Sequence, residues 1–348
     1  MGAGLGSRLV AAAPSAKSIR GVFPIMATPF TESKEVDFDD LVKEVDFLDR
    51  CGVHGMVWPQ LASEYWLLKK EERLRGMELL ARAAKGRKPA LVLGVQGPNI
   101  DAMLEYAQHA EKLEPDAMIA IPPTEAKTLD DFLNYYRALA RLTKRPIFVQ
   151  TSGGAKGIDP KIEALVELAR EFPNCAYVKE EYAPIIERMR ELTQHRPPIR
   201  GIFSGAHGKG WTYELRLGCD GTCPGAPLSD VYVRIWDLYQ AGRKAEALDV
   251  FGKLMLLVNL DSQIPGVFQY LMKRRGVFKT TVSRQRERKF TPEAADEIEF
   301  NFAALKPFLF RGQSAPWRDA PPLTMNINDS DTGQPATGGL AWLKPSAA

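Results

Sequence analysis

The sequence contains little that would bind a metal ion or form disulfide bonds. It has four cysteines and four histidines in 348 residues. Only Cys219 and Cys223 are close together, and no pair of histidines complements them as zinc ligands. A chain of this length does not need a disulfide framework for stability. We therefore expect buried free thiols at Cys51, Cys175, Cys219 and Cys223, and no metal site.

Blocks of like charge and long apolar runs are also missing. Lysine and arginine total 46, aspartate and glutamate total 43, and the two signs are interleaved along the chain. This composition predicts no binding to nucleic acid and no acidic tail for a basic partner. The longest apolar runs fall well short of the roughly 18–20 residues that a membrane-spanning helix needs. We therefore expect no membrane association.

The two ends of the chain differ in composition from its body. Residues 1–20 are rich in glycine and alanine and end in small residues that resemble a signal-peptidase site, but the apolar part is too short for a complete signal. We expect a flexible leader and a cytoplasmic protein, with export as the alternative if this segment is the remnant of a signal. Residues 312–348 are polar and rich in glycine and proline, which predicts a disordered tail.

The region 21–242 alternates short apolar runs with longer amphipathic segments. The runs lie at 21–30, 55–60, 90–97, 117–123, 146–152, 175–181, 199–206 and 221–227. Each is continuously apolar, as strands buried on both faces of a parallel sheet must be. Eight consecutive strand–helix units favour a closed barrel over an open doubly wound sheet, and no Gly-x-Gly-x-x-Gly follows the first run. The predicted fold class is therefore α/β, a (β/α)8 TIM barrel.

Helices are expected after each run and beyond the barrel. Asn99 is predicted to cap the helix that follows it, and Asp159 to cap another, with Pro160 at its first helical position. Residues 243–311 contain no further strand-like run and predict an appended C-terminal helical extension. Its apolar faces need cover from the barrel wall or from another subunit.

A lysine follows the sixth apolar run. In a (β/α)8 barrel the active site lies at the carboxyl ends of the strands, and Lys179 is the only lysine at the end of an inner strand. Burial makes the neutral amine of a lysine accessible, and a neutral amine attacks a ketone to form an iminium. Because side chains alternate along a strand, Glu181 shares a face with Lys179 and is placed to transfer protons. A salt bridge at the end of the strand is the structural alternative.

Several segments resemble the dihydrodipicolinate synthase / N-acetylneuraminate lyase family of Schiff-base (β/α)8 enzymes. They are GVFPIMATPF at 21–30, VKE at 178–180, FSG at 203–205 and GCDGT at 218–222. The resemblance runs from Gly21 to about Leu309. It implies that Lys179 is the Schiff-base lysine, that the substrate is pyruvate or a related 2-keto acid, and that the chain forms a homo-oligomer, a tetramer or a dimer. No cofactor is implied, because the iminium serves as the electron sink.

Other positions depart from the pattern of that family. Its loop after the second strand is usually Gly-(Thr/Ser)-Thr-Gly-Glu and binds the substrate carboxylate, whereas this chain has QLASE at 60–64. Glu64 matches the glutamate of this pattern, whereas the threonine hydroxyls are absent. Ser63 is the candidate substitute for them. Gln150 stands where the resemblance implies a proton-relaying tyrosine, and glutamine cannot be a general acid. These departures argue against true dihydrodipicolinate synthase activity.

The candidate site combines these residues. Lys179, Glu181 and His207 are the candidate catalytic residues, the last two for proton transfer. The candidate substrate-binding residues are Thr28, Ala62, Ser63, Glu64, Gln150, Ser152, Ser204 and Cys223.

Two further features are expected near the site. Trp58, Tyr65 and Trp66 follow one another closely and are expected at the rim after the second strand, as packing or as a platform for a sugar ring or aryl group. Lys156 is the candidate stand-in for an arginine that binds a second carboxylate in some family members.

Two functions remain open from the sequence. One is a Schiff-base-forming lyase that acts on a 2-keto acid or sugar acid, as a pyruvate-type aldolase or as a 2-keto-3-deoxy sugar acid dehydratase. The other is a catalytically attenuated barrel that acts as a small-molecule binding or regulatory protein, which the loss of the tyrosine and the threonines motivates.

Overall fold

The structure is a computed structural model that describes residues 17–285 and 290–310. The predictions for residues 1–16 and for the tail after residue 310 lie outside these ranges. The first described residue, Lys17, forms an ion pair of 3.1 Å with Asp116. The division of the chain into leader, barrel, extension and tail stays a prediction.

Within the described residues, eight parallel strands form the barrel expected from the sequence, and the predicted fold class is confirmed. The strands are shorter than the apolar runs: β1 (Gly21–Val22), β2 (Gly55–Trp58), β3 (Ala90–Gly94), β4 (Ala117–Ala120), β5 (Ile147–Gln150), β6 (Tyr177–Glu180), β7 (Gly201–Ser204) and β8 (Gly221–Thr222). Their order in the sheet is β1-β8-β7-β6-β5-β4-β3-β2. Ile25 bridges to both Val57 and Gly225, which joins the two ends of the sheet.

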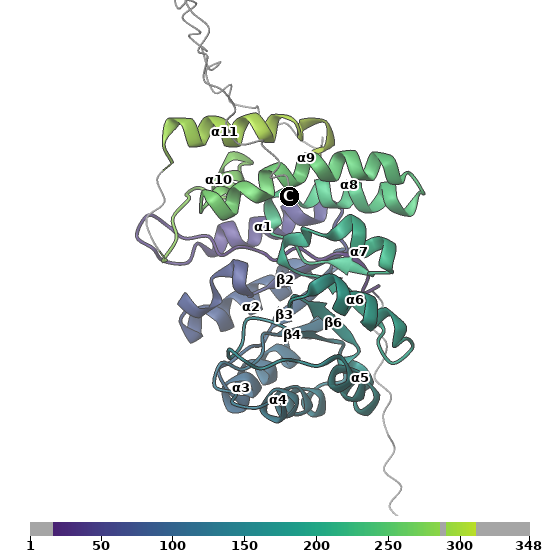
Figure 1. The fold of residues 1–348 in the computed structure, drawn as a ribbon. Coiled ribbons are helices and arrows are strands. Elements are labelled where there is room, and N and C mark those ends of the chain that lie inside the picture. Colours follow the sequence, from purple (N-terminus) through teal and green to yellow (C-terminus); the bar gives the residue numbers. More distant parts are fainter. Residues whose placement is uncertain (1–16, 286–289, 311–348) are drawn as a thin grey trace, which may run out of the picture. The chain divides into compact units, whose positions relative to one another are not determined.

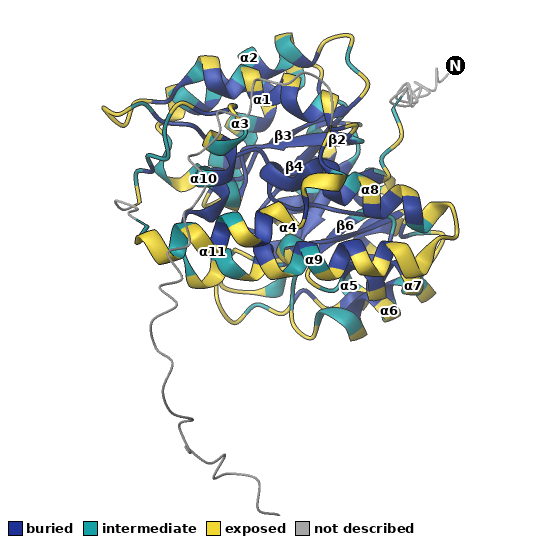
Figure 2. Cartoon of the chain, turned by 90° about the horizontal axis from the view of Figure 1, so that it is seen from above, coloured by how far each residue is buried: buried dark blue, intermediate teal, exposed yellow. Residues whose placement is uncertain are grey.

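Each strand is followed by a helix. The helices are α1 (Phe38–Arg50), α2 (Lys70–Ala84), α3 (Ile100–Lys112), α4 (Leu129–Leu142), α5 (Ile162–Glu171), α6 (Ile185–Gln194), α7 (Trp211–Leu217) and α8 (Ser229–Gln240). Figure 2 shows the strands in the colour of buried residues and the helices with exposed outer faces. In the described residues no helix combines the length and the apolar character needed to cross a bilayer.

The two predicted helix caps have different outcomes. Asn99 accepts a hydrogen bond from the Ala102 amide at 3.1 Å, so this cap is confirmed. The cap at Asp159 is wrong, because α5 begins at Ile162. The Asp159 carboxylate instead lies 3.4 Å from the guanidinium of Arg188, which also donates to the Pro160 carbonyl at 2.7 Å. This arginine on α6 contacts Asp159 and Pro160, which both lie outside α5.

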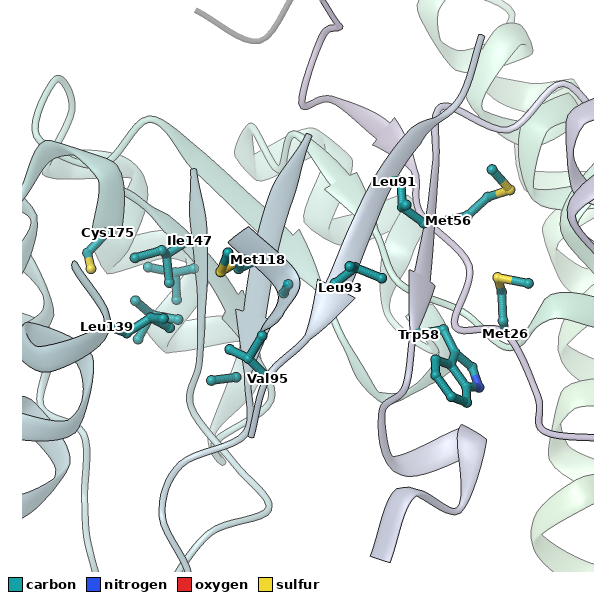
Figure 3. Close-up of a cluster of buried hydrophobic side chains, with 14 of the residues drawn as sticks. Met26, Met56, Trp58, Leu91, Leu93, Val95, Met118, Leu139, Ile147 and Cys175 are labelled. Atoms are coloured by element: carbon teal, nitrogen blue, oxygen red, sulfur yellow. The ribbon is translucent and has the colours of Figure 1, made fainter. Parts of the chain in front are cut away.

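Side chains fill the space inside the barrel and the layer around it. The rings of Phe23, Phe148 and Phe203 meet inside the barrel with centroids 4.8–5.8 Å apart. A larger cluster lies between the strands and the surrounding helices, and Figure 3 shows part of it. Because the barrel interior is a packed core, ligand chemistry is confined to its end.

The extension consists of α9 (Lys244–Gln263), α10 (Val267–Arg274) and α11 (Pro292–Ala303). Helix α9 contacts α8, α10 and α11, and Figure 1 shows these helices side by side. After α10 the chain returns to the loops that follow β1 and β2. There Thr280 donates to the Phe30 carbonyl at 2.5 Å, and Ser283 donates to the Glu64 carboxylate at 2.8 Å. The extension therefore packs against the end of the barrel where the site is expected.

Candidate active site

Lys179 lies near the carboxyl end of β6, and its side chain is almost completely buried, with 3% of the residue exposed. Strand register places it opposite Gln150 on β5 and Phe203 on β7. Its Nζ donates to Gln150 Oε1 at 3.1 Å and lies 3.1 Å from Glu181 Oε1. The amine is therefore held between an amide oxygen and a carboxylate, at the end of the barrel that carries active sites in this fold.

Glu181 is the residue that connects three strand ends. Its Oε2 accepts from the Ser152 hydroxyl at 2.9 Å, and its Oε1 accepts from the Ala206 amide at 2.8 Å. Burial alone would raise the pKa of Glu181, but the Lys179 ammonium and these two hydrogen bonds outweigh it and hold the pKa below its ordinary value. Glu181 is therefore ionised at neutral pH beside the lysine, as its position two residues along the strand predicts.

His207 lies in the short 3-10 turn Ala206–Gly208 after β7, with a left-handed backbone at φ 59°. Its carbonyl accepts from the Tyr232 hydroxyl at 2.5 Å, and its ring meets Phe268 edge to face with centroids 5.0 Å apart. Burial lowers the pKa of His207, and the nearby Asp261 carboxylate only partly opposes this shift. The imidazole is therefore neutral at neutral pH, and it directly follows Ala206, whose amide donates to Glu181.

The polar groups after β1 and β2 bond mainly to one another. Thr28 donates to the Ser63 carbonyl at 2.6 Å, and Ser63 donates to the Met26 carbonyl at 2.5 Å while it accepts from the Gln60 amide at 2.9 Å. Glu64 has a left-handed backbone and accepts from Ser283. These hydrogen bonds hold the loop itself, and none of them reaches Lys179.

Trp58 was expected at the rim after β2, and that prediction is wrong. The residue is fully buried in β2, and its indole nitrogen donates to the Thr28 hydroxyl at 3.2 Å. Gly76 on α2 makes room for the ring, because a Cβ at this position would lie 2.3 Å from it. Trp66, by contrast, is 49% exposed and lies at the rim.

Ser204 and Cys223 lie on either side of the barrel wall. Ser204 is in register with Glu180, so it faces the side opposite Lys179, and its hydroxyl donates to the Gly205 carbonyl at 3.4 Å. Cys223 is buried, and burial raises its pKa to about 12, with the charges of Lys179 and Glu181 acting on the thiol. The structure thus brings Cys223 near the lysine as a neutral thiol and does not bring Ser204 there.

All four cysteines are buried free thiols, as predicted. Among the described residues, no group of three or more histidine, cysteine, aspartate or glutamate side chains is arranged to hold a metal ion. The site therefore consists of an amine, a carboxylate, an imidazole and neutral hydrogen-bonding groups.

Two cavities are lined by residues next to the Lys179–Glu181 pair, although neither of these two residues lines them. The first, which we call the loop cavity, has a volume of about 210 Å³ and is lined by residues that include Pro122, Ser152, the glycine-rich stretch 153–157 and Tyr182. Lys156, the candidate binder of a second carboxylate, belongs to this stretch and is exposed. Ser152 joins the cavity to the site through its hydrogen bond to Glu181.

The second cavity, which we call the helix cavity, has a volume of about 240 Å³. It lies between the ends of the barrel strands and helices α9 and α10. Its lining includes Ala62, Glu64 and His207 from the barrel and Asp261 and Phe268 from the extension. The sequence did not point to Asp261, because an acidic residue in an amphipathic helix is normally solvated, and it gave no reason to place Phe268 at the site. The packing of α9 and α10 at the end of the barrel is needed to identify them.

The fold and this site define the chain as a (β/α)8 barrel with a buried lysine near the end of the sixth strand, and in this chain the lysine is paired with a carboxylate. The chain belongs to the Dihydrodipicolinate synthetase family, whose model matches residues 18–300. Membership supports a lyase of the pyruvate-dependent aldolase and dehydratase type.

Curated relatives align over most of their length. A 4-hydroxy-tetrahydrodipicolinate synthase of Rhizobium meliloti (strain 1021) is 27% identical over 80% of this chain and 96% of the relative. An L-2-keto-3-deoxyarabonate dehydratase of Azospirillum brasilense is 23% identical over 84% of this chain and 96% of the relative. The relatives of this chain thus include enzymes named for two different reactions.

Solved structures share the fold. A prophage protein of E. coli K12 in complex with pyruvate superposes with a TM-score of 0.74 at 20% identity, over 84% of this chain and 99% of the other. A dihydrodipicolinate synthase of Rhodopseudomonas palustris gives a TM-score of 0.74 at 22% identity, over 83% and 98% of the two chains. At these identities the similarity establishes the architecture alone.

Proposed function

We propose that the chain is a Schiff-base-forming lyase that binds a 2-keto acid as an iminium on Lys179. The observation that carries this proposal is the buried Lys179 Nζ, held 3.1 Å from both Gln150 Oε1 and Glu181 Oε1. A buried amine with an adjacent proton acceptor is the arrangement that iminium formation requires. The two reactions under consideration are a pyruvate-type aldol cleavage and the dehydration of a 2-keto-3-deoxy sugar acid.

In this mechanism Glu181 accepts and donates the protons that iminium formation requires. It takes one proton from the Lys179 ammonium, and the free amine then adds to C2 of the keto acid. Glu181 gives its proton to the former carbonyl oxygen and takes another from the nitrogen, which leaves a neutral carbinolamine. Protonation of the hydroxyl releases water, forms the iminium and restores the carboxylate. The iminium then accepts the electron pair from the neighbouring bond, so the mechanism does not call for a metal or a diffusible cofactor.

The remaining groups would position the substrate. The Gln150 amide and the Ser152 hydroxyl adjoin Lys179 and Glu181 and are suited to hold substrate oxygens. The neutral imidazole of His207 is the second candidate for proton transfer. Thr28, Ser63 and Glu64 would support the loop after β2, since their hydrogen bonds are made within the protein.

Similarity to named relatives supports the substrate class. One relative is named for an L-2-keto-3-deoxyarabonate dehydratase, and one structural neighbour was solved with pyruvate. We extend the 2-keto acid chemistry to this chain, together with a cytoplasmic location and a homotetramer or homodimer. Exposed apolar side chains on the extension, Leu256 on α9 and Phe300 on α11, are consistent with a subunit contact.

A second function is a barrel that binds a keto acid without efficient turnover. Gln150 favours it, because this side chain occupies the expected tyrosine position and bonds directly to Lys179. An amide cannot relay a proton, so turnover depends on Glu181 or His207.

Borohydride trapping tests the proposal. The full chain is incubated with pyruvate or other 2-keto acids, reduced, digested and analysed by mass spectrometry. We expect one stable adduct, on Lys179. A Lys179→Met variant should give none, whereas Lys144→Met, which removes an exposed lysine, should react as the wild type does. Folded protein that gives no adduct with any keto acid would contradict the lyase, and an adduct without product formation would favour the binding protein.

A further inference from the structure

A second group of polar side chains lies on the opposite face of β5 and β6 from Lys179. It consists of Thr151, which directly follows β5, Glu180, the last residue of β6, and Arg188 on α6, and all three are buried. Because side chains alternate along a strand, Glu180 points outward toward α6, whereas Lys179 and Glu181 point into the site. No step of the proposed mechanism uses the three outer side chains.

The hydroxyl of Thr151 continues the hydrogen bonding of the sheet beyond the end of β6. The register of β5 and β6 ends at Gln150 and Lys179, and the Thr151 amide then donates to the Lys179 carbonyl at 3.2 Å. Beyond that point the amides of Glu181 and Tyr182 donate to the Thr151 hydroxyl oxygen, at 2.8 Å and 3.1 Å. A side chain thus binds the backbone of Glu181 where a strand carbonyl would otherwise be needed.

Glu180 fixes the orientation of this hydroxyl. A hydroxyl has one hydrogen, and Thr151 donates it to Glu180 Oε1 at 2.7 Å, so its lone pairs face the two amides. The Lys179 carbonyl, another acceptor within reach, is farther away at 3.4 Å. Glu180 Oε1 also accepts from the Tyr182 amide at 2.8 Å. The backbone after β6 is therefore held by two acceptors that are hydrogen-bonded to each other.

Arg188 connects this group to α6 and to the loop after β5. Its Nε lies 3.2 Å from Glu180 Oε2, an ion pair without the alignment of a hydrogen bond. Its other guanidinium nitrogens lie 3.4 Å from the Asp159 carboxylate and 2.7 Å from the Pro160 carbonyl. The guanidinium also lies over the Tyr182 ring, 5.1 Å from its centroid. The carboxylate that orients the hydroxyl is therefore itself fixed by a helix.

We propose that Thr151, with its hydroxyl oriented by Glu180, is a positioning residue that holds the Glu181 carboxylate against Lys179 for proton transfer. Glu181 lies beyond the last residue of β6, so strand pairing alone does not fix the direction of its side chain. A displacement of about 1 Å in a catalytic group can lower a rate by about 100-fold. This inference rests on the proposed Schiff-base function, and Thr151 acts through Glu181 rather than on the substrate.

Time-resolved trapping tests this role. The full chain is mixed with pyruvate and quenched with borohydride after increasing times, which measures the rate of iminium formation separately from the final occupancy of Lys179. Thr151→Val keeps the size of the side chain and loses the hydroxyl, so we expect the rate to fall at least about tenfold. Final occupancy and the half-saturating pyruvate concentration should stay within about twofold of the wild type, because proton transfer affects the rate and not the binding.

A conservative variant and a matched control separate this role from a structural one. Thr151→Ser keeps the hydroxyl that accepts from the Glu181 amide, so its rate should stay within about threefold of the wild type. The Thr143 hydroxyl, before β5, likewise donates to a carboxylate, that of Glu111, at 2.7 Å and accepts from the Arg145 amide at 3.1 Å. Thr143→Val should therefore change the rate by no more than about twofold. If circular dichroism shows that Thr151→Val does not fold, Thr151→Ala replaces it in the comparison with Thr151→Ser.

A double-mutant cycle tests whether Thr151 acts through Glu181. In a Glu181→Gln background the proton-transferring carboxylate is already lost, so adding Thr151→Val should lower the rate by no more than a further factor of about two. An independent effect of Thr151 would instead multiply the two losses.

The outcomes separate the two proposals. The positioning role is overturned, and the lyase proposal stands, if the wild type forms the adduct and any of three results is found. These are a Thr151→Val loss in final occupancy rather than in rate, a Thr151→Ser rate as low as that of Thr151→Val, and multiplied losses in the double variant. If the wild type forms no adduct with pyruvate or any other 2-keto acid, the lyase proposal is overturned together with the inference that rests on it.

Discussion

Two buried carboxylic acids lie in different regions of the barrel and make the same backbone contact. Glu181, after β6, accepts from the Ala206 amide at 2.8 Å, and Glu44, on α1 beside β1, accepts from the Ala27 amide at 3.0 Å. Glu181 also has the Lys179 ammonium at 3.1 Å, whereas Glu44 Oε2 has no hydrogen-bond partner in the described structure. Burial raises the pKa of Glu44 well above its ordinary value, while the ammonium keeps that of Glu181 below it.

The surrounding hydroxyls differ in the same way. On the β1–β2 side, the hydroxyls of Thr28 and Ser63 donate to backbone carbonyls. On the β5–β6 side, Ser152 donates to the Glu181 carboxylate. In the first region the hydroxyls stabilise the loop after β2. In the second region the Ser152 hydroxyl binds the carboxylate of the Lys179–Glu181 ion pair. Burial alone would not distinguish the two regions, because both acids are buried. The Lys179 ammonium beside Glu181 distinguishes them.

The largest expected difference between the regions is in activity. Glu181→Gln keeps the size of the side chain and loses its ability to move protons, so we expect iminium formation and turnover to fall by at least about 100-fold. Glu44→Gln replaces a carboxyl whose pKa is raised by burial with an amide of the same shape, and its rate should stay within about threefold of the wild type. Rates of borohydride trapping with pyruvate measure both. A Glu181→Gln variant with an undiminished rate would remove this residue from the mechanism.

The sequence predicts much of the region around Lys179, because side chains alternate between the two faces of a strand. Continuous apolar runs identify the strands, and alternation along β6 places Lys179 and Glu181 on one face, as the 3.1 Å pair shows. The sequence does not reveal which polar atoms are already used. Ser63 stands where the family resemblance implies a substrate-binding residue, yet its hydroxyl donates to the Met26 carbonyl.

Long-range packing accounts for the other differences from expectation. Trp58 is buried because Gly76, on a different element, leaves space for its ring. Asp159 does not cap α5 because Arg188 on the next helix holds its carboxylate. Asp261 lines the same cavity as His207 because α9 packs at the end of the barrel. Each case depends on a residue distant in sequence, which local patterns do not encode.

A second comparison concerns the serines of the two regions, Ser63 and Ser152, and the quantity compared is the free energy of unfolding. Ser63→Ala removes a hydroxyl that makes two buried hydrogen bonds and leaves the Gln60 amide unsatisfied, so we expect a loss of about 2 kcal/mol in the free energy of unfolding. Ser152→Ala should cost less than about 1 kcal/mol, because Glu181 keeps the Ala206 amide and the Lys179 ammonium. Urea denaturation of both variants measures the difference. Equal losses would show that the Ser152 hydroxyl also has a mainly structural role.

The smallest expected effect is the pH dependence of stability, which should have opposite signs for the two acids. The raised pKa of Glu44 contributes stability that is fully present below pH 4.5, the ordinary pKa of a glutamate. This stability is lost as pH rises through the pKa of the folded state. The wild type should therefore lose about 1 kcal/mol or more of unfolding free energy relative to Glu44→Gln between pH 5 and pH 8.

The lowered pKa of Glu181 gives a contribution to stability that is present above pH 4.5 and is lost as pH falls through the folded-state pKa. The deficit of Glu181→Gln should therefore be complete at neutral pH and shrink only in acid. Urea unfolding across this range measures both differences, and profiles with the same sign would mean that Glu44 and Glu181 do not differ in ionisation as their surroundings indicate.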